Sequence, residues 1–314
     1  MFLVTGTASG IGAETARAFH ATGADVFMID RDMVKGGSVR KDILVTSEGK
    51  GKLELLYRDL GSFKSIRACA AEFLRKSNKL NVLVNNAGKE DAAYYILLCY
   101  WCTPLIYVGI RNPPEGTKDD GFEAQFGTNY LGHFLLFQLL LPTLLVSSTP
   151  SFNSRVINVS SAAHRKSPIV FDNFSLKGIY TPDIGYAQSM AAKIHMANQI
   201  ERLYSSQGLH ALSLCPGGIL GGAQQYDDPE KTKTRIEQVR HLLKNTAQGA
   251  ATTVLAAVGK VWEGKGGRFL QNCGESEVLK EGSASSIGYA PHAFDEEAEE
   301  KLWKISCELI GEGI

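Results

Sequence analysis

The sequence has no surplus of charge of either sign, because 33 lysines and arginines balance 33 aspartates and glutamates over 314 residues. Such a balance creates no long-range field that attracts nucleic acid or an anionic membrane, and it favours a small uncharged partner. Cysteine is also scarce, and its six positions (69, 99, 102, 215, 273 and 307) lack the density of a disulfide scaffold. We therefore expect no nucleic-acid partner and a reducing, cytoplasmic environment.

We expect no secretory signal either, since no basic segment or cleavage site precedes the first apolar run, Phe2–Thr5. A strand that begins directly after Met1 is abrupt, which raises the question of a misplaced start codon. We find no internal repeat, low-complexity tract or linker, while 44% of the residues are hydrophobic. The chain is therefore predicted to form one globular domain, residues 1–314, with a packed core.

Short apolar runs that favour strands alternate with segments of helical spacing. The runs are Phe2–Thr5, Val26–Ile29, Leu53–Tyr57, Val82–Val84, Val156–Val159 and Ala211–Leu214. This alternation predicts an α/β fold of the Rossmann type, in which a doubly wound parallel sheet carries helices on both faces.

Two helical patterns carry further expectations. The apolar run Phe134–Leu145 is expected to be broken at Pro142. The tail, residues 220–314, is predicted to be a variable, substrate-side segment that ends in an acidic amphipathic helix near Asp295–Leu309.

A glycine cluster, Gly6-Thr7-Ala8-Ser9-Gly10-Ile11-Gly12, directly follows the first predicted strand and opens a helix. Glycines at this spacing allow a tight turn and a close approach to a pyrophosphate, which then binds the free N–H groups and the positive dipole of the helix N-terminus. Glycine clusters also occur in ordinary surface turns. The order strand, glycines, helix favours a dinucleotide site.

The second predicted strand ends in Asp30-Arg31, where the adenosine ribose of a dinucleotide would lie. Asp30 can accept a hydrogen bond from a ribose 2′-hydroxyl, which favours NAD, whereas Arg31 would attract the 2′-phosphate of NADP. Both can also be solvated charges at a strand end. We expect NAD or NADP, with a slight preference for NAD.

With seven motifs in the family's order, the chain resembles the short-chain dehydrogenase/reductase family. Within that family it is most similar to the retinol-dehydrogenase-like and WW-domain-oxidoreductase-like branch that is common in fungi. The motifs cover residues 2 to 219 and comprise Thr5–Gly12, Asp59-Leu60, Asn85-Asn86-Ala87-Gly88, Asn129 in Thr128–Phe134, Val159-Ser160-Ser161, Tyr186 and Pro216-Gly217. The resemblance implies hydride transfer between NAD(P) and a carbonyl or alcohol carbon of an apolar small molecule. Members of the family often dimerise through the helices around Asn129 and Tyr186, so the resemblance also gives a homodimer as an expectation.

The resemblance also implies which positions hold the cofactor. It places Gly6, Ser9, Gly10, Ile11 and Gly12 at the diphosphate, Asp59 and Leu60 at the adenine, Asn86, Ala87, Gly88 and Tyr186 along the cofactor, and Pro216, Gly217 and Ile219 at the nicotinamide.

Three catalytic positions follow from the same resemblance. Asn129 would order a water of the proton relay, Ser161 would hydrogen-bond the substrate oxygen, and Tyr186 would be the acid or base. Ser160 is an alternative to Ser161, which the family pattern favours.

The sequence departs from the family at one decisive position. A phenol has a pKa of ~10, and the family lowers it by ~3 units, roughly 4 kcal/mol, with a lysine one helical turn beyond the tyrosine. That position holds Met190, which offers neither a charge nor a donor. Lys193 lies on nearly the same helical face as Tyr186 but about 10 Å from it along the axis. Its flexible side chain can therefore replace the lysine in part, or it can be a solvated or loosely paired lysine.

Other departures concern the cofactor grip. Relatives often have histidine before the Pro-Gly pair and threonine a few residues after it, where this chain has Cys215 and Gly221. An impaired, nucleotide-binding relative without turnover is therefore the alternative to an active oxidoreductase. An isomerase or cyclase on the same scaffold has no positive residue evidence.

An apolar insertion of 21 residues, 89–109, interrupts the motif after Gly88. A membrane span there would have to leave and re-enter one soluble sheet, whereas a lid over an apolar substrate is compatible with the fold. Cys99-x-x-Cys102 has no second ligand pair nearby, so we predict no metal site. If the insertion is translated, we expect a poorly packed apolar flap.

We hypothesise that the insertion is a retained intron. Gly88-Lys89 can be encoded with the donor GTAAG, Leu105-Ile106 with a branch-like CTAAY, and Val108-Gly109 with an acceptor TAG. Excision from the second base of codon 88 to the first base of codon 109 keeps the reading frame and restores glycine before Ile110.

Overall fold

The computed structural model describes residues 1–87, 115–219, 243–280 and 287–311. The insertion 89–109, together with Gly88 and Gly221, lies outside the described residues. The predictions made for these positions therefore stay predictions.

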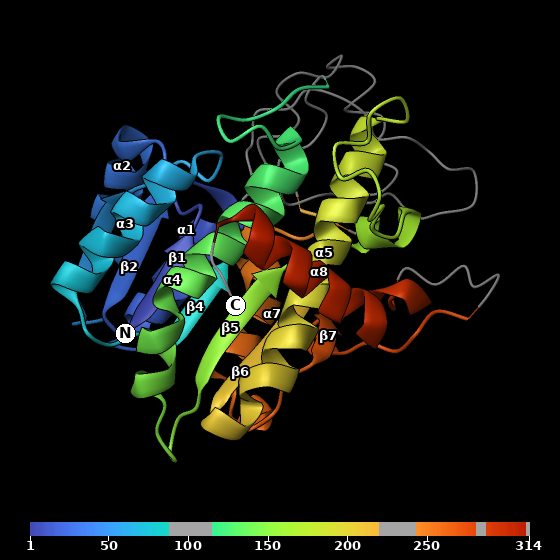
Figure 1. Ribbon diagram of the computed structural model, residues 1–314. Coiled ribbons are helices and arrows are strands. Elements are labelled where there is room, and N and C mark those ends of the chain that lie inside the picture. Colours follow the sequence, from blue (N-terminus) through green and yellow to red (C-terminus); the bar gives the residue numbers. More distant parts are fainter. Residues whose placement is uncertain (88–114, 220–242, 281–286, 312–314) are drawn as a thin grey trace.

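One eight-stranded sheet in the order β3-β2-β1-β4-β5-β6-β7-β8 forms the centre of the fold (Figure 1). Its strands are β1 (Phe2–Thr5), β2 (Val26–Asp30), β3 (Leu53–Tyr57), β4 (Val82–Asn85), β5 (Ser154–Val159), β6 (Leu209–Cys215), β7 (Arg268–Gln271) and β8 (Gly274–Glu275). All neighbours are parallel except the antiparallel β7–β8 pair. The six predicted strands and the doubly wound Rossmann architecture are confirmed.

Helices cover both faces because successive strand side chains point to opposite sides. Leu3 packs with one layer, whereas Phe2 and Val4 pack with the other. The first layer holds α3 (Phe63–Lys76), α4 (Gly132–Ser147), α5 (Pro182–Tyr204) and α8 (Glu296–Leu309), and the second holds α1 (Gly10–Ala21), α2 (Met33–Thr46) and α7 (Thr246–Val258). In Figure 1, α8 lies over α5 on the near face of the sheet.

The expected break at Pro142 is wrong, because α4 continues through it to Ser147. Pro142 faces solvent, while Leu140 and Leu144 on either side are fully buried, so packing holds the helix despite the missing donor. Among the described residues only the continuous helix Phe126–Ser147 is long and apolar enough to cross a membrane, and 67% of its most apolar window is buried inside the fold. That burial is typical of a core helix.

Three histidines attach the segment before α8 to the rest of the domain. His164 Nδ1 donates to the Ser161 carbonyl (2.6 Å), and its Nε2 accepts from the Ala290 N–H (3.2 Å). His292 Nε2 donates to the His164 carbonyl, and His195 Nε2 donates to the His292 carbonyl, each at 2.8 Å. Burial lowers the pKa of His164 to about 3 and that of His195 to about 4. Both rings are therefore neutral at physiological pH.

These two buried histidines predict acid sensitivity. The unfolded chain protonates them below pH ~6.5, while the folded chain does so only near the lowered values, so their stabilisation is complete above pH ~6.5 and is lost as the pH falls through those values. Each should lower the free energy of unfolding by about 1 kcal/mol between pH 7.5 and pH 5.5. Urea unfolding at both pH values measures the loss. The double variant His164→Asn/His195→Asn should show about 2 kcal/mol less of this pH dependence, and an undiminished dependence would contradict the assignment.

Candidate functional site

The predicted site segments gather at one edge of the sheet, because each follows the carboxyl end of a parallel strand. Gly6–Gly12 follows β1, Asp30 ends β2, Asn86-Ala87 follows β4, Ser160-Ser161 follows β5 and Pro216-Gly217 follows β6. Segments far apart in the sequence therefore form a common edge.

The glycines of the first loop are required by geometry. Gly6 and Gly10 have φ values of 74° and 57°, and a Cβ on Gly6 would lie 2.7 Å from the Ala87 Cα. A Cβ on Gly12 would clash with the Gly6 carbonyl oxygen. The loop leads into the N-terminus of α1, so the positive end of the helix dipole faces it. Ser9 occupies the N-cap position but makes no side-chain hydrogen bond to the first turn of the helix. The loop fits the pyrophosphate of a dinucleotide.

Two buried polar atoms around the loop support this fit. Thr7 Oγ1 and Asn86 Oδ1 have no hydrogen-bond partner among the described residues. The Asn86 amide donates from its Nδ2 to the carbonyls of Thr5 (2.9 Å) and Gly6 (3.3 Å). A ligand in the loop can pair with the remaining acceptors.

The carboxylate of Asp30 is bound by main-chain donors. Oδ2 accepts from the Ala8 N–H (2.7 Å), and Oδ1 accepts from the N–H groups of Arg31 (2.7 Å) and Asp32 (3.0 Å). Asp30 thus fixes the shape of the glycine loop, beside any contact with a ribose. Arg31 is exposed next to it, so both features that argued for different cofactors remain at the ribose position.

The adenine-side positions are placed differently from one another. Asp59 Oδ1 accepts from the Gly61 N–H at 2.9 Å, which shapes the turn after β3. Leu60 is only 5% exposed and packs in the core. Asp59 is half-buried at the sheet edge, where a ligand contact is compatible with its position.

A chain of hydrogen bonds joins the glycine loop to Asn129. Thr5 Oγ1 accepts from the N–H groups of Asn86 (3.0 Å) and Ala87 (2.8 Å), and it contacts His133 Nε2 at 2.9 Å. His133 Nδ1 lies 2.8 Å from the Asn129 carbonyl, which can only accept. Burial, with the charges of Lys193 and Arg58, lowers the pKa of His133 well below its usual value. The neutral ring therefore carries its proton on Nδ1 and accepts from Thr5 through Nε2.

Asn129 lies in a π-helical segment, Phe126–Leu131, that leads into α4. Such segments are rare and often occur at functional sites. Its Nδ2 donates to Ser189 Oγ (3.1 Å), which donates to the carbonyl of Tyr186 (2.8 Å). The structure thus connects Asn129 to the α5 turn that carries Tyr186, and both side chains are fully buried.

The two adjacent serines have different partners. Ser160 Oγ donates to the Met190 carbonyl at 2.8 Å, whereas Ser161 Oγ accepts from the Ala163 N–H at 3.2 Å. The Ser161 hydroxyl proton therefore has no acceptor in the hydrogen bonds of the described ranges. This difference favours Ser161 as the donor to a substrate.

Met190 packs against Tyr186 and Ala163 in a small apolar cluster. Lys193 is 1% exposed, and its Nζ donates to the carbonyls of Asn85 and Val159, each at 3.0 Å. The alternative of a solvated or loosely paired Lys193 is wrong, because the side chain is buried and its Nζ reaches the ends of both β4 and β5. Burial, and secondly the charge of Arg58, lowers the pKa of Lys193 to about 7.

The nicotinamide-side positions are held by a lysine that the sequence did not indicate. Lys244 Nζ donates to the Pro216 carbonyl (3.1 Å) and to Asn272 Oδ1 (2.7 Å), beside Gly217 with its φ of 93°. Ile219 packs with Ile11 of the glycine loop. The predicted nicotinamide and diphosphate positions therefore lie side by side.

Two further residues were missed by sequence reasoning. Thr5 and His133 were quoted only as parts of motifs, and no role was assigned to either. Only the meeting of β1, β4 and α4 in space shows that they link the loop to Asn129.

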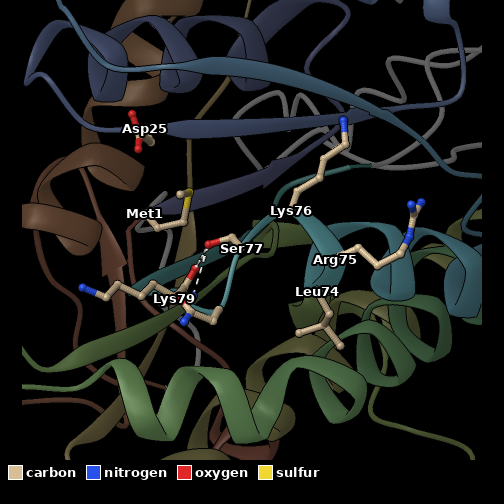
Figure 2. A pocket seen from close by; sticks show the side chains of 8 residues that line it. Met1, Asp25, Leu74, Arg75, Lys76, Ser77 and Lys79 are labelled. Carbon is tan, nitrogen blue, oxygen red and sulfur yellow. Dashed lines mark hydrogen bonds between the residues drawn. The ribbon is translucent and has the colours of Figure 1, made fainter.

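A pocket of about 540 Å³ lies elsewhere, at the amino ends of the strands (Figure 2). It is lined by Met1, Asp25, Leu74, Arg75, Lys76, Ser77, Asn78 and Lys79. Figure 2 shows that Arg75, Lys76 and Lys79 point in different directions, so they do not converge on one ligand. The opposite edge of the sheet therefore remains the candidate site.

Comparisons with known proteins agree with this geometry. The family model described as short chain dehydrogenase matches residues 1–232. "Short-chain dehydrogenase/reductase prx1" of Penicillium roqueforti is 48% identical over 99% of this chain and 84% of the relative. Human "Retinol dehydrogenase 12" is 30% identical over 98% of this chain and 85% of the relative.

A solved structure extends the agreement to three dimensions. The crystal structure of an uncharacterised protein from Mycobacterium Paratuberculosis superposes with a TM-score of 0.68 at 27% identity, covering 99% of this chain and 92% of the other. The match to the family model and the near-complete alignment with the relatives show that the chain belongs to the short-chain dehydrogenase family.

Proposed function

We propose that this protein transfers a hydride between NAD(P) and the carbonyl or alcohol carbon of an apolar small molecule, of the secondary-metabolite class. The observation that carries the proposal is the hydrogen-bonded chain from the glycine loop through Thr5, His133, Asn129 and Ser189 to the Tyr186 turn. This hydrogen-bonded chain joins the residues proposed for cofactor binding to those proposed for proton transfer, which supports the proposal. The name of the human relative, Retinol dehydrogenase 12, supports an apolar alcohol as substrate.

The chain's own residues have separable tasks in this reaction. When bound, the nicotinamide supplies or accepts the hydride. Tyr186 exchanges the proton of the substrate oxygen, and the Ser161 hydroxyl donates a hydrogen bond to the same oxygen. Asn129 is fixed by His133 and Ser189, so its amide can hold a water that connects the tyrosine with solvent.

The weak point of the site is the contact between Met190 and Tyr186. A methionine cannot favour the ionised phenol, and the ammonium of Lys193 donates to the carbonyls of Asn85 and Val159 instead. Loss of a positioned acid or base costs about 10²- to 10⁴-fold in rate. The proposed enzyme is therefore slow, and the second candidate function is nucleotide binding without turnover, which the same contact favours.

Restoring the family lysine separates these two functions. Met190→Lys should raise the rate of carbonyl reduction by about 10²-fold, because an ammonium one turn from Tyr186 favours its ionised form. Reduced-cofactor oxidation measures the rate, and fluorescence titration with NADH and NADPH measures binding. Met190→Leu is the volume-matched control without charge and should show no gain. Dinucleotide binding without turnover in both the native protein and Met190→Lys would favour the second candidate.

The two serines give a matched test of the substrate contact. Ser161→Ala should lower kcat by about 10²-fold with unchanged cofactor affinity, because it removes a donor to the reacting oxygen. Ser160→Ala should mainly lower the free energy of unfolding by about 1 kcal/mol, because it removes a buried bond to the Met190 carbonyl. Steady-state kinetics and urea unfolding of both variants check this, and the reverse pattern would assign the role to Ser160.

A further inference from the structure

Lys193 is a buried cation whose two hydrogen-bond acceptors belong to different strands. Its Nζ lies 3.0 Å from the carbonyl of Asn85, the last residue of β4, and 3.0 Å from that of Val159, the last residue of β5. The carbonyl of Lys193 itself accepts from Asn158 Nδ2 at 2.9 Å, which fixes this turn of α5 to β5. The lysine therefore joins one helix to the ends of two strands.

The register of the sheet explains why a donor is needed there. Asn85 pairs with Asn158, so a continued parallel ladder would bring the Ala87 N–H to the Val159 carbonyl. The Ala87 N–H instead turns to Thr5 Oγ1, toward β1. The Val159 carbonyl loses its ladder donor where β4 leaves β5, and Lys193 supplies that donor.

The two residues after each strand give this position its functional meaning. Asn86 and Ala87 continue from β4 beside the glycine loop. Ser160 and Ser161 continue from β5, where Ser160 Oγ donates to the Met190 carbonyl and Ala163, two residues after Ser161, packs with Met190 and Tyr186. The separation of β4 and β5 at their carboxyl ends therefore sets the distance between the cofactor side and the substrate side of the site.

We propose that Lys193 is a positioning residue of this site, which holds the ends of β4 and β5 at a fixed separation through its two hydrogen bonds. The proposal rests on the proposed function, because the two strand ends are the walls of the proposed hydride-transfer site. This role differs from that of the family lysine, whose position Met190 occupies. The family lysine lowers the pKa of the tyrosine, whereas Lys193, three residues further along α5, fixes the positions of two strand ends.

The two hydrogen bonds of Lys193 do not depend on its positive charge. Both acceptors are neutral carbonyls, and a neutral amine retains two N–H donors, so deprotonation leaves both hydrogen bonds possible. Arg58, after β3, and His133, on α4, are the ionisable groups coupled to Lys193 by charge. Arg58 is itself buried, and its charge opposes a second cation. Bridging should therefore persist across the titration of the lysine.

The test compares Lys193→Met, which keeps the length without donors, with Lys193→Gln, which keeps two N–H donors without charge. Fluorescence titration with NADH and NADPH between pH 6 and pH 9 gives the cofactor Kd. Lys193→Met should raise the Kd about tenfold or more at every pH, because the Val159 carbonyl loses its donor and the Asn85 carbonyl loses the bond that ties it to the same amine. The native protein and Lys193→Gln should keep a low Kd on both sides of pH 7. Lys304→Met, which removes an exposed cation of α8, is the matched control and should not change the Kd.

Three results would overturn the proposal. The effect would be one of charge if the Kd of the native protein rose above pH 7 and Lys193→Gln bound the cofactor as weakly as Lys193→Met. A Lys193→Met that binds as the native protein would remove any role in the site. Lys193 would have only a structural role if Lys193→Met and Lys193→Gln lost equal amounts of kcat/KM and of unfolding free energy while the cofactor Kd did not change.

A second readout separates this proposal from the proposed function. Amide hydrogen exchange at Ala87 and Ala163 reports the strand ends without any cofactor. Both should exchange at least tenfold faster in Lys193→Met than in Lys193→Gln. If the native protein binds neither dinucleotide, the proposed function fails, while this exchange difference still decides whether Lys193 holds the strands. Equal exchange in the two variants would refute the bridging.

Discussion

The hydroxyl of Thr5 is the contact on which the organisation of the site depends. It accepts the N–H groups of Asn86 and Ala87 and pairs with the neutral ring of His133. The ends of β1 and β4 and the start of α4 are thereby held at one oxygen atom. Loss of this oxygen would leave three buried polar groups unpaired, each at a cost of about 1 to 3 kcal/mol. Since His133 also binds the Asn129 carbonyl, the shape of the glycine loop and the position of Asn129 are mechanically coupled.

The buried positive charges near the site lie at the strand ends and not next to the Tyr186 side chain. Met190 makes the surroundings of Tyr186 apolar, while Lys193 is buried with its Nζ on two strand-end carbonyls and Arg58 is buried with its Nε and Nη1 unpaired among the described residues. A buried cation is costly unless its donors are paired. Lys193 is tolerated because two carbonyls receive its donors and because its pKa is lowered to about 7. The lysine of α5 therefore binds strand ends, while the family's lysine position next to Tyr186 holds Met190.

The central strands could be predicted from the sequence because each is a short apolar run next to a helical pattern, and β1 and β3 have the expected bounds. The strand β7 was missed, since Arg268–Gln271 is brief and begins with a charged residue. The site positions came from motifs in the chain, whereas the burial of Lys193 and the link through His133 did not. Helical spacing gives the distance along α5 but not which strand ends lie beneath it, and those contacts join residues more than 100 positions apart.

The histidine contacts of the segment before α8 have a consequence for how the protein matures. Ser161 is made in the middle of the chain, yet the ring that holds its carbonyl is itself held by Ala290, near the C-terminus. The chain is synthesised from its N-terminus, so β1 to β6 leave the ribosome before residues 290–292 do. The loop that carries Ser161 can acquire its last supports only after those residues have emerged. A ribosome that stalls or terminates early would therefore yield a sheet able to assemble but a reaction centre left unfinished.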